Sequence, residues 1–532
     1  MKWKHAASLS ALAVLSVAVV WAFCQRPNAA GVGGLGRPTS AAGAEPGASQ
    51  QGPPQTAAFA SASRAATSAT PAVSSRASSP PRTYRGVLIP GVPHVRQKTD
   101  FCGEAAAEMW LRKLGLKNAD QDYVFDQSGL DPLAARGCYT ADLVQALRKI
   151  GFDTGSASSA VPAAGTAAGM EQQWAALHAD LAAGVPSIIC MRTADGPAAT
   201  EHFRLVLGYD QKTDEVIYHE PAEDDGAYRR MPRQTLLSLW PLKYSPARWV
   251  VIRIRLAATD KIKDPPPAET FTPADYAQHI MKLRKLIPAG DGFTVVVQPP
   301  FVVIGDEPAR TVSQRSAATV RWAVDLLKKE YFPKDPAEIL DVWLFRSESS
   351  YRKHAKDIFG DEPGTPFGYY SSAARALIMN AATGGGTLVH ELVHPFIEAN
   401  FPHCPPWLNE GLGSLYEQCG QENGRIWGYT NWRLQGLQEA IRAGEGQPFD
   451  HLLAMDVREF YGRGAGANYA QARYLCYYLQ QQGKLREFYH KFHANLAADP
   501  TGLQTLKDVL GADDLAAFQK RWEAFVMTLT FP

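Results

Sequence analysis

The chain carries two histidines four residues apart, with a glutamate beside the first, in the run His390-Glu391-Leu392-Val393-His394. An α-helix advances about 100° per residue, so the two histidines lie one above the other on one helical face. Their ring nitrogens can then reach one metal ion, while Glu391 points to the same side near an open position. The alternative is an ordinary amphipathic helix with histidines on its surface.

A third donor follows in the run Trp407-Leu408-Asn409-Glu410-Gly411, just after two prolines. On a following helix that folds back, Glu410 supplies a third ligand and leaves the fourth position for water. Three protein ligands and a water distinguish a catalytic zinc site from a closed structural one. The spacing therefore predicts a zinc site made of His390, His394 and Glu410.

A second group of reactive side chains lies in the first half of the chain. Cys102 opens a helical pattern, and the positive end of the helix dipole favours the thiolate there. His202, at the start of a strand pattern, can act as its acid/base partner, and Glu220 can orient the imidazole. The Gln97 amide can stabilise an oxyanion. The alternative is a buried cysteine in a fold that only binds peptide.

This second group resembles papain-like hydrolases in its chain order of Cys, His and carboxylate. The runs Gln97-x4-Cys102-Gly103-Glu104-Ala105 and His202–Asp210 are similar to the cysteine peptidases that process bacteriocin leader peptides, over about 86–225. The resemblance implies a papain-like fold with these catalytic residues: Cys102, His202, Glu220 and Gln97. That family has Asp where this chain has Glu220, whose extra methylene displaces the carboxylate. Acyl transfer and amide hydrolysis are alternatives to proteolysis.

Residues 384–416 resemble the gluzincin metallopeptidases, whose third zinc ligand is a glutamate on a separate helix. The similarity to peptidase MA-like bacterial proteins covers about 300–525. It implies that zinc is bound by His390, His394 and Glu410, and that Glu391 is the general base that activates the bound water. The chain has no Gly-x-Met-x-Asn run to bind a free amino terminus, which disfavours an exopeptidase.

Three further residues bear on the expected zinc site. Thermolysin-type enzymes place an Asp four residues after the third ligand to hold a zinc histidine, but this chain has Ser414 there, so another group must do so. Pro395 removes one helix hydrogen bond and is expected to end or kink the helix. Tyr469 is the candidate donor to a tetrahedral intermediate, or else a tyrosine packed in a helical lobe.

Hydrophobic periodicity divides the chain beyond residue 85 into two globular regions. In 86–257, helix patterns precede strand patterns, which is typical of an α+β domain. The helices are expected at 102–114 and 141–150, and the strands at 86–89, 187–191, 202–209, 215–218 and 249–254. A proline-rich linker covers 258–274.

The region 275–532 is expected to form a mixed sheet followed by a helical lobe. Strands are expected at 293–297, 301–304, 339–345, 367–370 and 375–379, and helices at 273–286, 313–331, 469–482, 485–496 and 515–529. The fold class is therefore α+β. A papain-like cysteine peptidase-like domain precedes a thermolysin/gluzincin-like zinc metallopeptidase domain with a helical C-terminal lobe.

The first 24 residues have the form of a secretory signal or a signal anchor, because two lysines precede an apolar run at 6–23. Residues 25–85 are rich in Ala, Ser, Pro and Gly and predict a disordered linker. The rest should be exported to the periplasm or beyond, either free or anchored to the inner membrane by 6–23. A net charge of +1 gives no reason to invoke nucleic acid.

Together these features predict an exported zinc-dependent peptidase with an appended cysteine peptidase-like domain and a polypeptide substrate. A strand near 369–379 would pair with an extended peptide. The alternative is a non-catalytic envelope or surface protein that binds polypeptide, although the retained Glu391 favours the enzyme. Cys404 and Cys419 flank Glu410, and they form either a disulfide or two independent buried thiols.

Overall fold

The computed structural model describes residues 84–161, 167–196, 199–245, 248–288, 290 and 292–531. The expected signal or anchor at 1–24, and nearly all of the expected linker at 25–85, lie outside the described residues. Within the described part, none of the helices has the length and apolar character needed to span a membrane.

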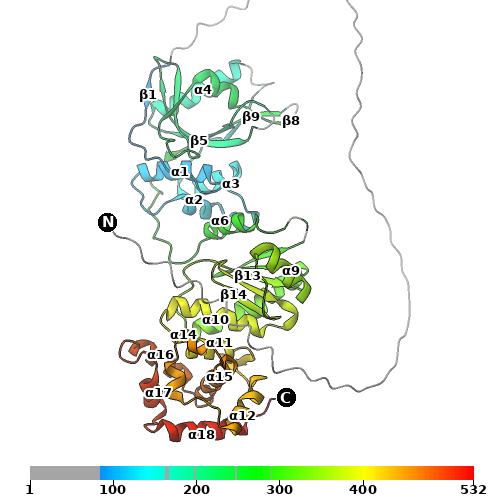
Figure 1. Cartoon of the computed structure of the whole chain (residues 1–532). Helices are drawn as coiled ribbons and strands as arrows, with labels where there is room; N and C mark the ends of the chain where they lie inside the picture. The colour runs from blue at the N-terminus through cyan, green and yellow to red at the C-terminus, as the bar shows by residue number, and fades with distance from the viewer. Residues whose placement is uncertain are drawn as a thin grey trace, which may run out of the picture. The chain divides into compact units, whose positions relative to one another are not determined.

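The helices of the N-terminal region are α1 (Cys102–Lys113), α2 (Gln121–Ser128), η3 (Pro132–Ala134), α3 (Thr140–Ile150), α4 (Ala167–Ala182) and α5 (Arg233–Leu239). Helices α1, α2 and α3 come before most strands of an antiparallel sheet, as the sequence predicted, whereas α4 and α5 lie between strands along the chain (Figure 1). The predicted helices at 102–114 and 141–150 are confirmed as α1 and α3, whereas α2 and α4 were not predicted. Trp174, Leu177 and Leu181 of α4 are buried.

The sheet of this region has strand order β3-β9-β4-β5-β6-β7, with β1 paired to β5 and β8 paired to β9. The strands are β1 (Val87–Leu88), β3 (Ser158–Val161), β4 (Ser187–Arg192), β5 (Glu201–Asp210), β6 (Glu215–His219), β7 (Arg229–Pro232), β8 (Leu242–Ser245) and β9 (Arg248–Arg255). A separate pair joins β2 (Phe152–Asp153) to β10 (Ala257–Ala258). Each predicted strand has its counterpart here.

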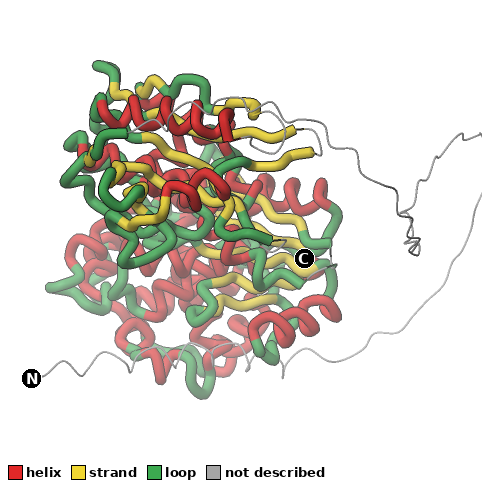
Figure 2. The backbone as a smooth tube through the Cα atoms, turned by 90° about the horizontal axis from the view of Figure 1, so that it is seen from above, coloured by secondary structure: helices red, strands yellow, loops and turns green. Residues whose placement is uncertain are grey.

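The C-terminal region has its own mixed sheet, of order β11-β12-β13-β15-β14. Its strands are β11 (Thr294–Gln298), β12 (Phe301–Gly305), β13 (Leu340–Phe345), β14 (Gly368–Ser371) and β15 (Ala376–Asn380). The three central strands are parallel and wholly or almost wholly apolar, because helices cover both faces of such sheets. In Figure 2 the strands of each sheet, in yellow, lie side by side with helices, in red, against them.

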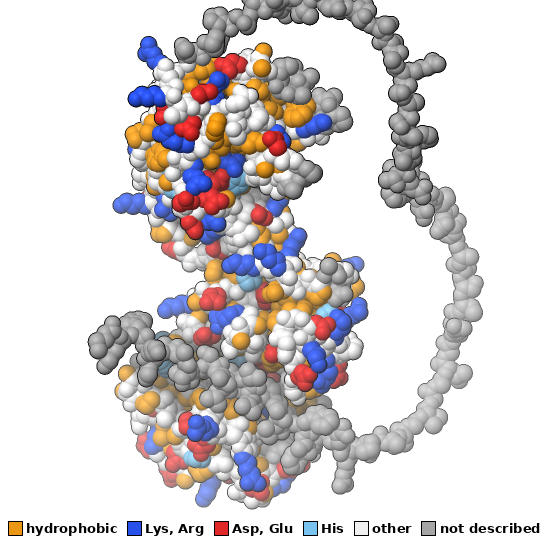
Figure 3. Space-filling model, turned by 45° about the horizontal axis from the view of Figure 1, so that its top comes forward, with side chains coloured by type: hydrophobic (Ala, Val, Ile, Leu, Met, Phe, Trp, Pro, Cys, Tyr) orange, Lys and Arg blue, Asp and Glu red, His pale blue; other side chains and the backbone are white. Residues whose placement is uncertain are grey.

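Helices make up most of the rest of this region. They are α6 (Pro273–Leu283), α7 (Ala309–Arg315), α8 (Trp322–Glu330), α9 (Glu348–Phe359), η5 (Ala381–Thr383), α10 (Gly386–Asn400), α11 (Pro406–Leu415), α12 (Arg433–Ala443), α13 (Phe449–Ala454), α14 (Val457–Phe460), α15 (Ala465–Gln481), α16 (Leu485–Asn495), α17 (Leu503–Leu510) and α18 (Leu515–Thr528). The helix predicted at 313–331 begins earlier, as α7, and continues into α8 through the π-helical segment η4 (Ser316–Arg321). Positively and negatively charged side chains are mixed on the face shown in Figure 3.

Pro395 does not end its helix, so that part of the prediction is wrong. The helix α10 continues to Asn400. A proline has no N–H to donate to the carbonyl of Glu391 four residues earlier. The apolar residues on both sides of the proline, Val393 and Phe396 among them, are fully buried. Their packing keeps the chain helical despite the missing hydrogen bond.

The disulfide between Cys404 and Cys419 is not formed, because both thiols are free. Cys404 precedes α11 and Cys419 follows it, and the ten-residue helix extends about 15 Å between them. A disulfide spans only about 4.4–6.8 Å between Cα atoms. Cys419 instead opens a hairpin of β16 (Cys419–Glu422) and β17 (Arg425–Gly428), which the sequence did not predict.

One buried cation fixes the end of α11 against α15. Arg473 of α15 has no exposed surface. Its guanidinium donates to the carbonyl of Ser414 at 2.8 Å, to that of Leu415 at 3.4 Å and to that of Tyr429. The carbonyls at a helix C-terminus have no partner inside the helix, so Arg473 satisfies groups that would otherwise be buried without one.

We expect Arg473→Met to lower the free energy of unfolding by about 2–4 kcal/mol, because it leaves several buried carbonyls without donors. Urea unfolding followed by tryptophan fluorescence measures this loss. Arg486→Met on α16, where the side chain is exposed, is the matched control. Equal stability of the two variants would show that these hydrogen bonds do not hold α11.

Candidate active sites

The three metal-ligating residues expected from the sequence come together where α10 meets α11. Each of His390, His394 and Glu410 offers one donor atom, and these atoms lie within 4.8 Å of one another. The Oε2 atom of Glu410 is 3.3 Å from Nε2 of His390 and 3.9 Å from Nε2 of His394. A Cβ on Gly413 would lie 3.2 Å from the His390 ring, so this glycine lets α11 approach the ring.

Both imidazoles are held by the nitrogen that faces away from Glu410. Nδ1 of His394 lies 2.9 Å from Oδ1 of Asn409. Nδ1 of His390 lies 3.3 Å from Oε1 of Glu417. With the proton on Nδ1 in each ring, Nε2 presents a lone pair toward Glu410. The two rings therefore direct Nε2 toward Glu410.

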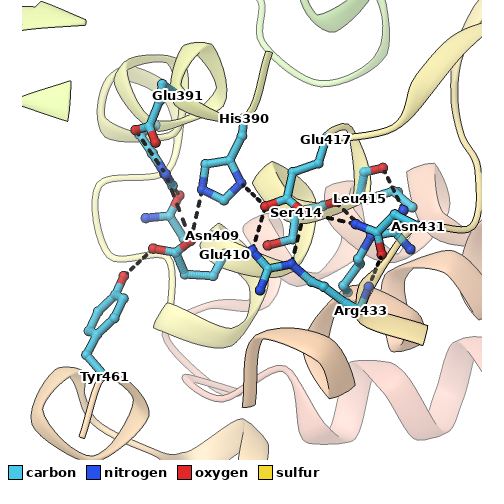
Figure 4. Close-up of polar contacts among 12 residues, drawn as sticks. His390, Glu391, Asn409, Glu410, Ser414, Leu415, Glu417, Asn431, Arg433 and Tyr461 are labelled. Atoms are coloured by element: carbon cyan, nitrogen blue, oxygen red, sulfur yellow. Dashed lines mark hydrogen bonds and ion pairs between the residues drawn. The ribbon is translucent and has the colours of Figure 1, made fainter. Parts of the chain in front are cut away.

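Glu417 contacts the His390 ring, which is the role that thermolysin-type enzymes give to an Asp at the position of Ser414. Figure 4 shows its carboxylate between His390 and Arg433. Arg433 donates to it at 2.7 and 2.9 Å, and Asn431 donates at 2.9 Å. Burial opposes its ionisation, but Arg433 outweighs burial and holds the pKa of Glu417 far below its usual range. The sequence could have indicated this role, because Glu417 lies only three residues after Ser414.

Glu391 lies beside the same donors. Its Oε2 atom is 4.0 Å from Nε2 of His394, and the residue is 7% exposed. Burial raises its pKa above the usual range. A carboxylate with a raised pKa accepts and releases protons nearer neutral pH, as a general base must.

Two tyrosines border the third donor. The hydroxyl of Tyr461 donates to Oε1 of Glu410 at 2.5 Å, so that Oε2 faces the histidines. Tyr469, the residue predicted from the sequence, is 8% exposed, and burial together with the Glu410 carboxylate raises its pKa well above the usual value. Tyr461 was missed, because it follows a short helix 51 residues beyond Glu410 and no local pattern marks it.

The buried charges around this site are unbalanced. Glu391, Glu410 and Glu417 are all buried, and Arg433 provides the permanent positive charge among them. Burial lowers the pKa of His390, but the adjacent carboxylates of Glu410 and Glu417, each 3.3 Å from a ring nitrogen, outweigh it and raise the pKa to about 10. The carboxylates therefore favour positive charge on or beside this imidazole.

The structure also brings together the candidate residues of the N-terminal region. Cys102 is the first residue of α1, and its thiol is hydrogen-bonded by the backbone of Phe203, which follows His202. Nε2 of His202 lies 2.5 Å from Oε1 of Glu220. The added methylene of Glu220 therefore does not prevent the contact expected of an Asp.

Arg204 is a further partner of Glu220 that the sequence did not single out. Its Nε atom donates to Oε2 of Glu220 at 2.6 Å. Residues two apart on a strand share a face, so the position of Arg204 relative to His202 was the available signal. Burial opposes ionisation of Glu220, but His202 and Arg204 outweigh it and lower its pKa to about 2.

Burial opposes the thiolate that the helix start was expected to favour at Cys102. Burial raises the pKa of Cys102 to about 11, and the backbone hydrogen bonds at the helix start offset this only in part. In the described chain the thiol makes no hydrogen bond to the His202 ring. The backbone N–H of Gln97 donates to the carbonyl of Pro221, the residue after Glu220, at 2.9 Å, and the side-chain Oε1 of Gln97 is buried without a partner.

Comparison with known proteins identifies the N-terminal region. Residues 89–246 match the Peptidase_C39 like family, which supports a C39-like domain of the cysteine peptidase type in this part of the chain. The matched range contains Gln97, Cys102, His202 and Glu220 and is close to the 86–225 expected from the sequence. No curated protein matches the chain.

We expect Cys102 to be alkylated faster than Cys138, Cys190, Cys404, Cys419 or Cys476, whose pKa values burial raises further. The thiolate reacts, so below its pKa of about 11 the rate at Cys102 should rise about tenfold per pH unit from pH 7 to 10. Brief iodoacetamide labelling read by mass spectrometry measures this. A rate at Cys102 that is flat across that range would mean that an ion pair with His202 already exists.

Proposed function

We propose that this chain is an exported zinc-dependent peptidase, in which the C39-like domain is joined to a metallopeptidase domain at about 275–532. The observation that carries the proposal is the position of Oε2 of Glu410. This atom is buried without a hydrogen-bond partner, and it lies between the Nε2 atoms of His390 and His394. A buried carboxylate oxygen without a partner is costly unless a cation is bound.

The donor set suits zinc. Two imidazole nitrogens and one carboxylate oxygen form a usual ligand set of catalytic zinc and leave a fourth position for water. The excess of buried carboxylates over Arg433 also favours a divalent cation there. His390, His394 and Glu410 would hold the ion, with Glu417 and Asn409 fixing the two rings.

Bound zinc would polarise the scissile carbonyl and acidify the attacking water. Glu391 would take the proton from that water and return it to the leaving amine, for which its raised pKa is suited. Tyr469 remains protonated at neutral pH, so its hydroxyl would donate to the oxyanion that forms on the carbonyl.

The substrate would be a polypeptide that pairs with β14. This strand lies at the edge of its sheet, and its partner in the described structure is β15. An edge strand presents unpaired N–H and C=O groups to which an extended peptide can add as a further strand.

The C39-like domain would supply a second site, with Cys102 as nucleophile, His202 as its acid/base partner, Glu220 as the orienting group and Gln97 as the oxyanion donor. Export rests on the signal-like residues 1–24. A non-catalytic envelope or surface protein that binds polypeptide is the rival, and it predicts no hydrolysis from either site.

We expect Glu391→Gln to retain about one zinc per chain and to lose hydrolysis by about 10²–10⁴-fold, because the base is gone and the ligands remain. Metal analysis and peptide cleavage measure the two effects, in a Cys102→Ser background that silences the thiol site. Glu398→Gln, on the same helix and with a side chain 61% exposed, is the control. Undiminished cleavage by Glu391→Gln would refute the mechanism.

We expect Glu417→Gln to weaken zinc binding by about 10–100-fold, because an amide orients His390 without the negative charge that strengthens the ligand. Competition with a chromophoric chelator measures the affinity. Glu445→Gln, an exposed position after α12, should leave it unchanged. If Glu417→Gln binds zinc as the unaltered chain does, this carboxylate has no role in the metal site.

A further inference from the structure

A cavity of about 500 Å³ lies at the N-terminal end of α10. Its walls come from η4, α8, the residue before β14, the start of α10 and the segment after α11. The volume is in the range of sites that bind small ligands or single side chains. None of the residues assigned to catalysis above accounts for this space.

The cavity adjoins the metal-ligating residues. Glu417 lines it, and the carboxylate of Glu417 is 3.3 Å from the His390 ring. Val389, the neighbour of His390, also lines it, as does Phe367, which directly precedes the edge strand β14. The start of the edge strand β14 and the residues beside the His390 ring therefore border the same cavity.

Aromatic side chains form the walls. Phe367 is 44% exposed and Trp432 is 48% exposed, although both are large and apolar. Trp322 completes the aromatic lining, and its indole N–H donates to Gln421 at 3.2 Å, which fixes the ring. Aromatic rings gain by offset or edge-to-face contact with another ring, in addition to the surface that they cover.

Small residues form the rest of the lining. Gly384, Gly385 and Gly386 are consecutive, and a Cβ on Gly386 would lie 2.0 Å from the carbonyl oxygen of Glu417. Ala318 and Thr319 of the π-helical segment η4 lie beside them. The missing side chains leave space in which a flat ring can lie against backbone.

The lining offers no charge to a ligand. It contains no lysine or arginine, and the carboxylate of Glu417 is already bound by Arg433, Asn431 and His390. Burial raises the pKa of the Cys419 thiol to about 12, so that group is neutral as well. A charged side chain would lose hydration there without gaining a partner.

We propose that this cavity receives an uncharged aromatic side chain of the polypeptide substrate, close to the bond that is cut. The proposal rests on the zinc peptidase function proposed above, and it makes Trp432 and Phe367 determinants of specificity. Phe, Tyr and Trp are favoured at one substrate position, and Lys, Arg, Asp and Glu are excluded from it.

The test is a synthetic peptide library cleaved by the zinc-loaded chain with Cys102→Ser, with cut sites read by mass spectrometry. Phe, Tyr or Trp should be preferred over Ala by about tenfold at one position near the cut. Trp432→Ala should reduce the ratio of kcat/KM for matched Phe and Ala peptides, and Leu286→Ala, an exposed leucine outside the cavity, should not. A library without aromatic preference, or an unchanged ratio in Trp432→Ala, would overturn the proposal.

Binding separates this proposal from the proposed function. Tryptophan fluorescence of the zinc-loaded Glu391→Gln chain reports peptide binding without cleavage. Phe peptides should bind more tightly than Ala peptides, and Thr319→Trp, which fills the cavity, should reduce this difference. That result supports the aromatic pocket even if no hydrolysis is found. Equal binding of the two peptides refutes it whether or not the chain hydrolyses peptides.

Discussion

Three carboxylates buried between α10 and α11 impose the constraint on which the rest of this region depends. Glu391, Glu410 and Glu417 are each at most 7% exposed, and within the described part of the chain the arginine that forms an ion pair with one of them is Arg433. Buried like charges destabilise a fold unless cations compensate them. A divalent ion beside Glu410 is the compensation that we propose.

The helices around the carboxylates follow from that constraint. Glycines let α11 approach both the His390 ring and α15, and Arg473 satisfies the carbonyls where α11 ends. The backbone of Glu417 lies so close to Gly386 that a side chain there would collide with it. Glu417 therefore both lies beside the His390 ring and bounds the cavity, so the proposed metal site and the proposed specificity pocket share this residue.

The C39-like domain repeats this chemistry with different elements. Glu220 lies between His202 and Arg204, as Glu417 lies between His390 and Arg433. In both sites an arginine keeps a buried carboxylate ionised, and the carboxylate orients an imidazole. The sites differ in the neighbours of the imidazole, because His390 also lies beside Glu410 and His394.

The sequence alone determined what short-range periodicity encodes. Histidines four apart share a helix face in any α-helix, so His390 and His394 were found without a structure, and alternation placed most strands. Tertiary structure decided the partners: Glu417, Tyr461 and Arg204 reach their sites across segments that no local pattern relates. Packing also keeps α10 helical beyond Pro395, because a buried helix is stabilised by contacts with residues far away in the sequence, which a short window of sequence does not contain.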